Sequence, residues 1–172
     1  MKTLWRIYRW GKDPKNEIAK FLQAGHSIEE AMLKFQREPE IENIFGNCAL
    51  NEGLQALIEL ACGISTPTKW DSTNARLGVG DSATAADPTQ TGLQAATNKT
   101  YIAMDGTYPQ RSGQIAKWRS TFASDDANYA WEEYTVVNAA TDAGVNLNRK
   151  CQAKGTKSVG ESWTLELDIT FS

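Results

Sequence analysis

The chain of 172 residues contains few of the residues from which catalytic and metal sites are usually built. There is one histidine, His26, and there are three cysteines, Cys48, Cys62 and Cys151. An odd number of irregularly spaced cysteines is not a disulfide framework, and no C-x-x-C motif occurs. We expect Cys48 and Cys62 to be small buried apolar residues. His26 has no second histidine or cysteine at ligand spacing, so we expect it to have a helix-cap or surface role and to form neither a metal site nor a hydrolase triad.

Long apolar runs are also missing. No stretch approaches the roughly 20 apolar residues that a transmembrane helix needs. Charges interrupt every apolar run near the N-terminus, which is unlike a signal peptide. We therefore expect a soluble protein that is made in a reducing cytoplasm and has no contact with a membrane. The chain is long enough to bury a core without disulfides or a metal ion.

Neither sign of charge dominates the whole chain. The 18 Lys and Arg residues stand against 21 Asp and Glu residues, a net charge of −3, which argues against a general nucleic-acid binder. The first 20 residues differ, because six basic side chains stand there against Asp13 and Glu17, a net charge of +4. These basic residues are Lys2, Arg6, Arg9, Lys12, Lys15 and Lys20. Positive charge is thus concentrated near the N-terminus.

Strict alternation indicates that the chain ends in a β-strand. Apolar residues occupy every second position from Trp163 to Phe171, and the residues between them are Thr164, Glu166, Asp168 and Thr170. A period of two places the two sets on opposite faces, which predicts a half-buried strand of an antiparallel sheet. Further strands are predicted at 75–80, 101–104, 115–123, 128–138 and 145–151. The predicted fold class is mainly β, an antiparallel sandwich or barrel-like domain over residues 46–172.

Residues 1–45 are expected to form a short α-helical arm before this domain. Asp13-Pro14 is typical of a helix start, with Asp as the N-cap and Pro at the first position. Ser27 and Glu30 have the spacing of a capping box for a second helix. The arm is therefore predicted to contain two helices.

A lead-in helix is predicted over residues 51–62, at the start of the β-domain. Leu54, Leu57, Ile58 and Ala61 are spaced three and four apart, which places them on one helical face. Gly63 follows as a typical C-cap. The pattern predicts an amphipathic helix.

Two motifs suggest a ligand but are better explained without one. Residues 78–83 loosely resemble a dinucleotide-binding glycine loop, but Asp81 adds a like charge and Pro88 disfavours the helix that should follow. We interpret them as a tight strand exit and predict no cofactor. Residues 125–128 form an oxygen-rich stretch that lacks the ligand pattern of a calcium loop. We expect a solvated turn there and no metal site.

Two acidic pairs, Asp125-Asp126 and Glu132-Glu133, are candidates for glycosidase-type carboxylates. On a strand, Glu132 and Glu133 point to opposite faces, so one of them is expected inward or at an interface. No catalytic constellation follows from these residues, and we predict that the protein is not an enzyme.

The segment Met1–Trp10 interleaves aromatic and basic residues. Arg, Tyr and Trp dominate the hot spots of protein interfaces, so we predict that Trp5, Arg6, Arg9 and Trp10 anchor the arm to a partner protein. Packing of the aromatic residues on their own domain is the first alternative. Stacking on nucleic-acid bases or lying on a membrane surface is the other.

A series of short blocks resembles a recurring structural module of tailed bacteriophages. The blocks are Ala75–Ser82, Thr91–Leu93, Met104-Asp105, Tyr108-Pro109, Trp118–Phe122, Ala127–Glu133, Leu147–Lys150, Gly155–Lys157 and Ser162–Leu165. Their order over roughly residues 47–172 carries the resemblance, and residues 1–45 lie outside it. The family consists of small virion proteins and fibre-associated domains. The resemblance implies a virion β-domain that is often trimeric and has no enzymatic activity.

Chain length decides between the positions that such a module takes on a particle. A tail fibre is usually a long chain, whereas here a short arm precedes a single β-domain that ends the chain. We therefore predict a capsid decoration (cement) protein in the virion, assembled in the host cytoplasm. Its expected partners are the major capsid protein and copies of itself in a homotrimer, with no nucleic acid and no membrane. The alternatives are a tail-fibre or baseplate adaptor with exposed Trp or Tyr in a glycan groove, and a cell-wall hydrolase that uses acids from residues 125–133.

Overall fold

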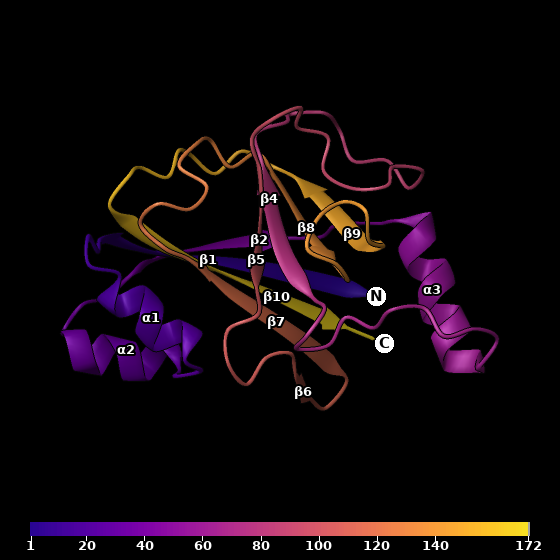
Figure 1. Ribbon diagram of the computed structural model, residues 1–172, viewed down its shortest axis with the longest axis horizontal. Helices are drawn as coiled ribbons and strands as arrows, with labels where there is room; N and C mark the ends of the chain where they lie inside the picture. Colours follow the sequence, from indigo (N-terminus) through magenta and orange to yellow (C-terminus); the bar gives the residue numbers. More distant parts are fainter. Residues whose placement is uncertain (172) are drawn as a thin grey trace. The chain divides into compact units, whose positions relative to one another are not determined.

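The computed structural model describes residues 1–171, and their elements are mainly strands (Figure 1). The strands are β1 (Lys2–Lys12), β2 (Glu40–Phe45), β3 (Cys48–Ala49), β4 (Arg76–Gly80), β5 (Lys99–Ala103), β6 (Gln110–Ser112), β7 (Ile115–Phe122), β8 (Glu133–Val137), β9 (Asn146–Cys151) and β10 (Glu161–Thr170). The helices are α1 (Glu17–Gln23), α2 (Ile28–Phe35) and α3 (Asn51–Cys62). The strands form two five-stranded antiparallel sheets, so the predicted mainly β class is confirmed, and two antiparallel sheets are what a sandwich-like arrangement requires.

The chain divides into two compact units, and each contains one sheet. Unit 1 consists of residues 1–46, 104–129 and 156–172, and unit 2 of residues 47–103 and 130–155. The chain first passes from unit 1 to unit 2 after Gly46. The N-terminal segment is nevertheless no separate arm, because its strands belong to the same sheet as β7 and β10.

The sheet of unit 1 has the strand order β2-β1-β10-β7-β6. Its central strands β1 and β10 run side by side in Figure 1, and Trp5 lies opposite Leu167. The next strand places Trp118 opposite the same leucine, so large apolar side chains line up across one face. Trp5 and Leu167 are fully buried, and Trp118 is nearly so. One face of this sheet is therefore an apolar core.

The expectation of a short α-helical N-terminal arm is wrong for residues 2–12, which form β1. The alternation in this segment is interrupted, because Leu4-Trp5 and Ile7-Tyr8 are apolar neighbours, but Trp5 and Ile7 lie on one face of the strand and Arg6 and Tyr8 on the other. The basic residues of the segment suggested a solvated surface instead. The polar partners that allow them into a sheet lie on β10, about the whole length of the chain away in sequence.

The predicted terminal strand β10 is confirmed, but it is buried on both faces and not only on one. Thr164, Glu166 and Asp168 on its polar face are all less than a tenth exposed. Helix α1 packs over β10 and β7 at one end of this face. Further along, ion pairs with neighbouring strands take the place of water at the carboxylates.

The two predicted helices between β1 and β2 are present, and the capping box is confirmed. Ser27 Oγ accepts from the Glu30 N–H, and the Glu30 carboxylate accepts from the Ser27 N–H. Helix α1 begins later than predicted, at Glu17, and its N-cap residue is Asn16. Asp13 still acts as its cap, because its carboxylate accepts from the backbone N–H groups of residues 17, 18 and 19. Both helices bury apolar residues against Tyr8 and Trp10.

The sheet of unit 2 has the strand order β3-β9-β8-β4-β5, and α3 packs on β9. Strands β4, β5, β8 and β9 coincide with predicted strands, although β8 is shorter than the predicted 128–138. Gly63 takes the left-handed conformation expected of the C-cap of α3. Cys62 is exposed and Cys48 is half-buried, so the prediction that both are buried apolar residues is wrong.

Candidate functional site

The two tryptophans predicted to bind a partner lie inside unit 1. Trp5 is fully buried and Trp10 is 2% exposed, and the Trp10 indole N–H donates to Thr164 Oγ1 at 3.2 Å. Neither ring can reach a partner surface without loss of the central strand. The prediction that Trp5 and Trp10 anchor the chain is therefore corrected to the alternative, in which they pack on their own domain.

Arg6 lies on the polar face of β1, where it joins two carboxylates of β10. Its guanidinium donates to Glu166 at 2.7 Å and to Asp168 at 2.9 Å, and Lys117 donates to the same Asp168 at 2.9 Å. The Tyr108 hydroxyl donates to Glu166 at 3.5 Å, and burial raises the pKa of Tyr108 to about 12. Arg6 thus holds the sheet together through a network of charges.

Arg9 is held in a similar way at the other side of β1. It donates to Glu40 at 2.9 Å and to Glu42 at 2.6 Å on β2, and its guanidinium lies 4.7 Å from the centre of the Trp163 ring. Both arginines predicted to bind a partner are therefore committed to contacts within unit 1. Anchoring of a partner by Arg6 and Arg9 would have to compete with these ion pairs.

A buried charge pair joins the helices of unit 1 to the sheet. Arg119 Nε donates to Asp105 at 2.9 Å, and the Arg119 side chain also donates to the backbone carbonyls of Leu22 and His26. Asp105 accepts from both the N–H and the hydroxyl of Thr121. Burial raises the pKa of Asp105, while the Arg119 charge and the Thr121 hydrogen bonds act in the opposite direction. His26 itself is exposed, as predicted.

Unit 2 contains a second buried pair, formed by Glu133 and Arg149. Both side chains are fully buried and lie 2.7 Å apart, and the carboxylate also accepts from the N–H groups of Gln94 and Ala95. Arg149 in turn donates to Gln90 and to the carbonyl of Thr84. The pair therefore fixes the long loop that follows β4. One member of the acidic pair was expected to face inward, and it is Glu133, whose carboxylate is engaged by Arg149 and two backbone N–H groups.

The glycine-rich segment at the end of β4 is explained by packing. A Cβ at Gly78 would lie 2.6 Å from the Tyr101 ring, and one at Gly80 would collide with the Glu133 carboxylate. The strand ends at Gly80 and a loop without regular structure follows. This agrees with the interpretation as a strand exit, because a phosphate-binding loop opens a helix.

The oxygen-rich segment of residues 123–128 binds the ammonium group of a lysine side chain. Lys157 is fully buried, and its ammonium donates to the Ala123 carbonyl and to Asn128 Oδ1, both at 2.8 Å. Burial lowers the pKa of Lys157 to about 8. Asp125 of the predicted turn is exposed and Asp126 is half-buried, and Lys157 links the two ends of the segment.

Helix α3 leaves two of its larger apolar side chains, Leu54 and Ile58, exposed to solvent. Its buried residues are Gly53 and Ala56, and a Cβ at Gly53 would lie 2.5 Å from the Leu147 Cα on β9. On the opposite side Leu54 is 39% and Ile58 is 58% exposed. Leu57 is half-buried and Ala61 is exposed, and both continue the same stripe. The predicted apolar face of this helix is therefore an open surface, which we call the α3 apolar face (Leu54, Leu57, Ile58 and Ala61).

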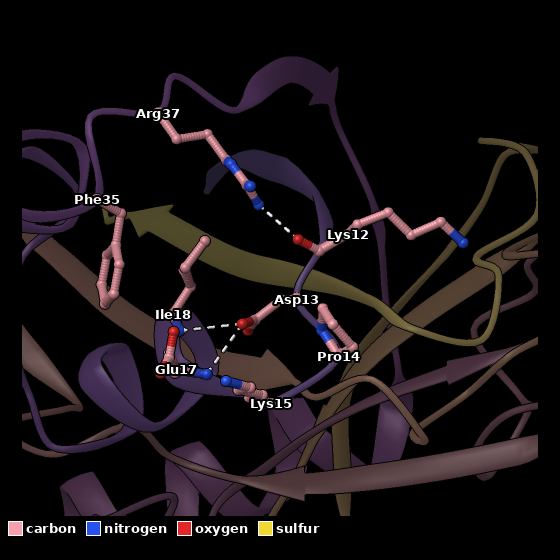
Figure 2. Close-up of a pocket in the computed structure, with 8 residues that line it drawn as sticks. All are labelled: Lys12, Asp13, Pro14, Lys15, Glu17, Ile18, Phe35 and Arg37. Atoms are coloured by element: carbon pink, nitrogen blue, oxygen red, sulfur yellow. Dashed lines mark hydrogen bonds between the residues drawn. The ribbon is translucent and has the colours of Figure 1, made fainter.

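Two adjoining hollows lie on the helical pair of unit 1. One, of about 260 Å³, is lined by residues 12–15, Glu17, Ile18, Phe35 and Arg37 (Figure 2). The other, of about 470 Å³, is lined by Glu17, Lys20, Phe21, Lys34 and Phe35. They share Glu17 and Phe35, so they form one hollowed region. Figure 2 shows Arg37 reaching to the Lys12 carbonyl and Asp13 turned to the start of α1, while the Lys12 side chain points away.

We call the cations around these hollows the α1–α2 basic surface, namely Lys15, Lys20, Lys34 and Arg37. All four side chains are exposed. Lys15 precedes α1, Lys20 lies on α1, Lys34 lies on α2, and Arg37 follows α2 by two residues. The N-terminal charge excess of the sequence indicated part of this surface, but the packing of α2 on α1 supplies Lys34 and Arg37.

Comparison with known proteins adds no relative. No family model, no curated protein and no solved structure matches the chain. Within residues 1–171, no three His, Cys, Asp or Glu side chains are grouped so that they could hold a metal ion. No helix in the same residues is long and apolar enough to cross a membrane.

Proposed function

We propose that the chain is a structural protein of a tailed-bacteriophage virion, a capsid decoration protein that binds the major capsid shell and other copies of itself. The sequence resemblance over residues 47–172 supports the virion, and the surface of unit 2 supports a role in assembly. The α3 apolar face is the observation that carries the proposal. The corrected placement of Trp5 and Trp10 moves the expected contact from the N-terminus to this helix.

The α3 apolar face is unusual for a helix of a protein that works alone. A surface helix normally turns its larger apolar residues to the core and its small or polar residues to water. Here the small residues Gly53 and Ala56 face β9, and Leu54 and Ile58 are left exposed. Full burial of an exposed leucine or isoleucine contributes about 1.5–3 kcal/mol, and a partner that covered these two side chains would gain roughly half of that for each, because they are 39% and 58% exposed. Contiguous exposed apolar surface of this kind is typical of a protein interface.

The interior of both units suits a module that transmits load instead of changing shape. Each unit contains a buried charge pair that also holds loops or helices to its sheet. The pairs are Arg119 with Asp105 in unit 1 and Arg149 with Glu133 in unit 2. Breaking one partner of such a pair is costly, so these contacts oppose local rearrangement. A shell under internal pressure is reinforced by many weak contacts that act together, and rigid modules serve this purpose.

The adaptor alternative predicted exposed Trp or Tyr in a glycan-binding groove. None of the five tyrosines, which all lie within residues 1–171, is exposed, although Tyr101 and Tyr129 are half-buried. All six tryptophans, at positions 5, 10, 70, 118, 131 and 163, are less than a tenth exposed. The hydrolase alternative relied on acids between residues 125 and 133, and Glu133 among them is neutralised by Arg149. Neither alternative has an observation in its favour, so we propose the decoration role alone.

Titration of the purified chain onto capsid shells that lack it tests the α3 apolar face. The unchanged chain is expected to saturate the shells, and the double variant Leu54→Glu with Ile58→Glu is expected to bind at least tenfold more weakly, because burying either carboxylate opposes docking. Sedimentation of the shells followed by densitometry measures the bound chain. Circular dichroism establishes that the variants are folded.

The matched control carries the same two added charges on neighbouring exposed positions, Gln55→Glu and Thr66→Glu. It is expected to bind as the unchanged chain does. Equal binding of the Leu54/Ile58 variant would remove α3 from the interface, and no binding of the unchanged chain would overturn the proposed function.

A further inference from the structure

The α1–α2 basic surface carries charge that the chain itself does not neutralise. None of its four cations forms a salt bridge with a carboxylate of residues 1–171, whereas Arg6, Arg9, Arg119 and Arg149 all do. Lys20 donates to the Lys15 carbonyl, and Arg37 to the carbonyls of Trp10 and Lys12. These contacts position the side chains and leave their charge in place.

Only two carboxylates line the hollows, and one of them is already committed. Asp13 accepts from three backbone N–H groups of α1 and from the Ser162 hydroxyl, and it is buried. Glu17 is exposed and lines both hollows. Among the residues that line the hollows, the four cations thus stand against one available carboxylate, in a chain whose overall net charge is −3, and the neighbouring Glu30 on α2 lies 3.5 Å from His26. Such a local excess attracts an anionic partner.

The aromatic rings of this surface position a cation and do not offer a place for a nucleic-acid base. His26 stacks on Phe21 with ring centres 3.8 Å apart, and the Lys34 ammonium lies 4.2 Å from the centre of the same ring. The rings of Phe35 and Phe21 are nearly perpendicular, with their centres 5.6 Å apart. Since a ring has two faces, His26 and Lys34 together occupy both. Single-stranded nucleic acid is normally bound by open aromatic faces.

We propose that the α1–α2 basic surface binds an acidic segment of a partner protein, with Asp and Glu carboxylates of that segment paired to Lys15, Lys20 and Lys34. The two adjoining hollows suit an extended peptide, which can follow from one to the other past Phe35. Lys34, held over Phe21, presents a fixed charge at the second hollow, and Lys15 with Arg37 supplies the first. The inference is independent of the decoration role, because it concerns unit 1 and an anionic partner, whereas that role rests on the apolar α3 of unit 2.

A fluorescein-labelled oligoglutamate peptide tests this surface directly by fluorescence anisotropy. We expect binding by the unchanged full-length chain, and a loss of at least tenfold in affinity for the triple variant Lys15→Glu, Lys20→Glu and Lys34→Glu. Affinity should also fall as ionic strength rises. The three lysines are exposed, so the triple variant is expected to retain the circular dichroism of the unchanged chain.

The control places the same change of charge outside the surface, at the exposed residues Lys2, Lys69 and Arg111, each replaced by Glu. It is expected to keep its affinity within about twofold, since distant exposed charges are screened. Equal losses of peptide affinity in both triple variants would show that only the overall charge of the chain matters, and would overturn the proposal. So would the absence of peptide binding, or tighter binding to oligothymidylate or to vesicles that contain phosphatidylserine.

Discussion

Replacing Arg149 with methionine is expected to lower the free energy of unfolding by about 3–5 kcal/mol. Methionine keeps much of the volume but leaves the Glu133 carboxylate buried without its counter-charge. It also removes the donors to Gln90 and to the Thr84 carbonyl, so the loop after β4 loses its attachment. Urea unfolding followed by circular dichroism measures the loss.

Two further variants separate the cost of the orphaned charge from the cost of the missing side chain. Arg149→Met combined with Glu133→Leu removes both charges. It is expected to recover part of the lost stability, because no buried charge is then left without a partner. Arg111→Met, at an exposed arginine, is expected to change stability by no more than about 0.5 kcal/mol. A loss below about 1 kcal/mol for Arg149→Met would show that water reaches Glu133 and would contradict the buried pair.

Gly53→Ala is expected to destabilise the chain, although the same change inside a helix normally stabilises by about 1 kcal/mol. The added Cβ would lie 2.5 Å from the Leu147 Cα and 2.6 Å from the Asn146 carbonyl oxygen, both on the backbone of β9. Neither atom can move aside as a flexible side chain does. We expect α3 to lift from β9 at a cost of about 1–3 kcal/mol, the usual range for overpacking.

The loss is measured by urea unfolding, and hydrogen exchange of the α3 amides locates it. Gln55→Ala, on the exposed side of the same helix, serves as the control and is expected to be neutral or slightly stabilising. An increase in stability for Gly53→Ala, or α3 amides that exchange no faster, would contradict the close packing of α3 on β9.

The sequence predicts elements whose determinants are local and fails where partners are remote. The capping box of Ser27 and Glu30 and the C-cap at Gly63 lie within a few residues of the helix ends that they fix, and both are confirmed. Strand β1 was missed because Arg6 becomes compatible with a sheet only through Glu166 and Asp168, which come from the opposite end of the chain.

Periodicity also predicts an element without predicting which of its faces is buried. The three-and-four spacing of Leu54, Ile58 and Ala61 correctly indicates a helix, but Gly53, which has no side chain, permits the close approach to β9. A sequence pattern predicts that the more hydrophobic face of a helix is buried. In α3 the less hydrophobic face is buried, because its small residues pack more closely on the sheet. The exposed stripe was therefore visible only after the helix had been placed on its sheet.

The α1–α2 basic surface could be predicted in part. The charge excess of the first 20 residues includes Lys15 and Lys20, and it was assigned to the aromatic segment at Trp5 and Trp10, which the sheet buries. The pairing of Lys34 with Phe21 depends on how α2 packs against α1, which no local pattern specifies.

Counting the chain on intact virus particles is the most direct test of its proposed place in the capsid. Quantitative mass spectrometry of purified particles, with the major capsid protein as internal reference, gives the number of copies. A decoration protein is expected in hundreds of copies, in a fixed ratio to the capsid protein. A handful of copies per particle, or a chain found only in the unassembled fraction, would contradict the account.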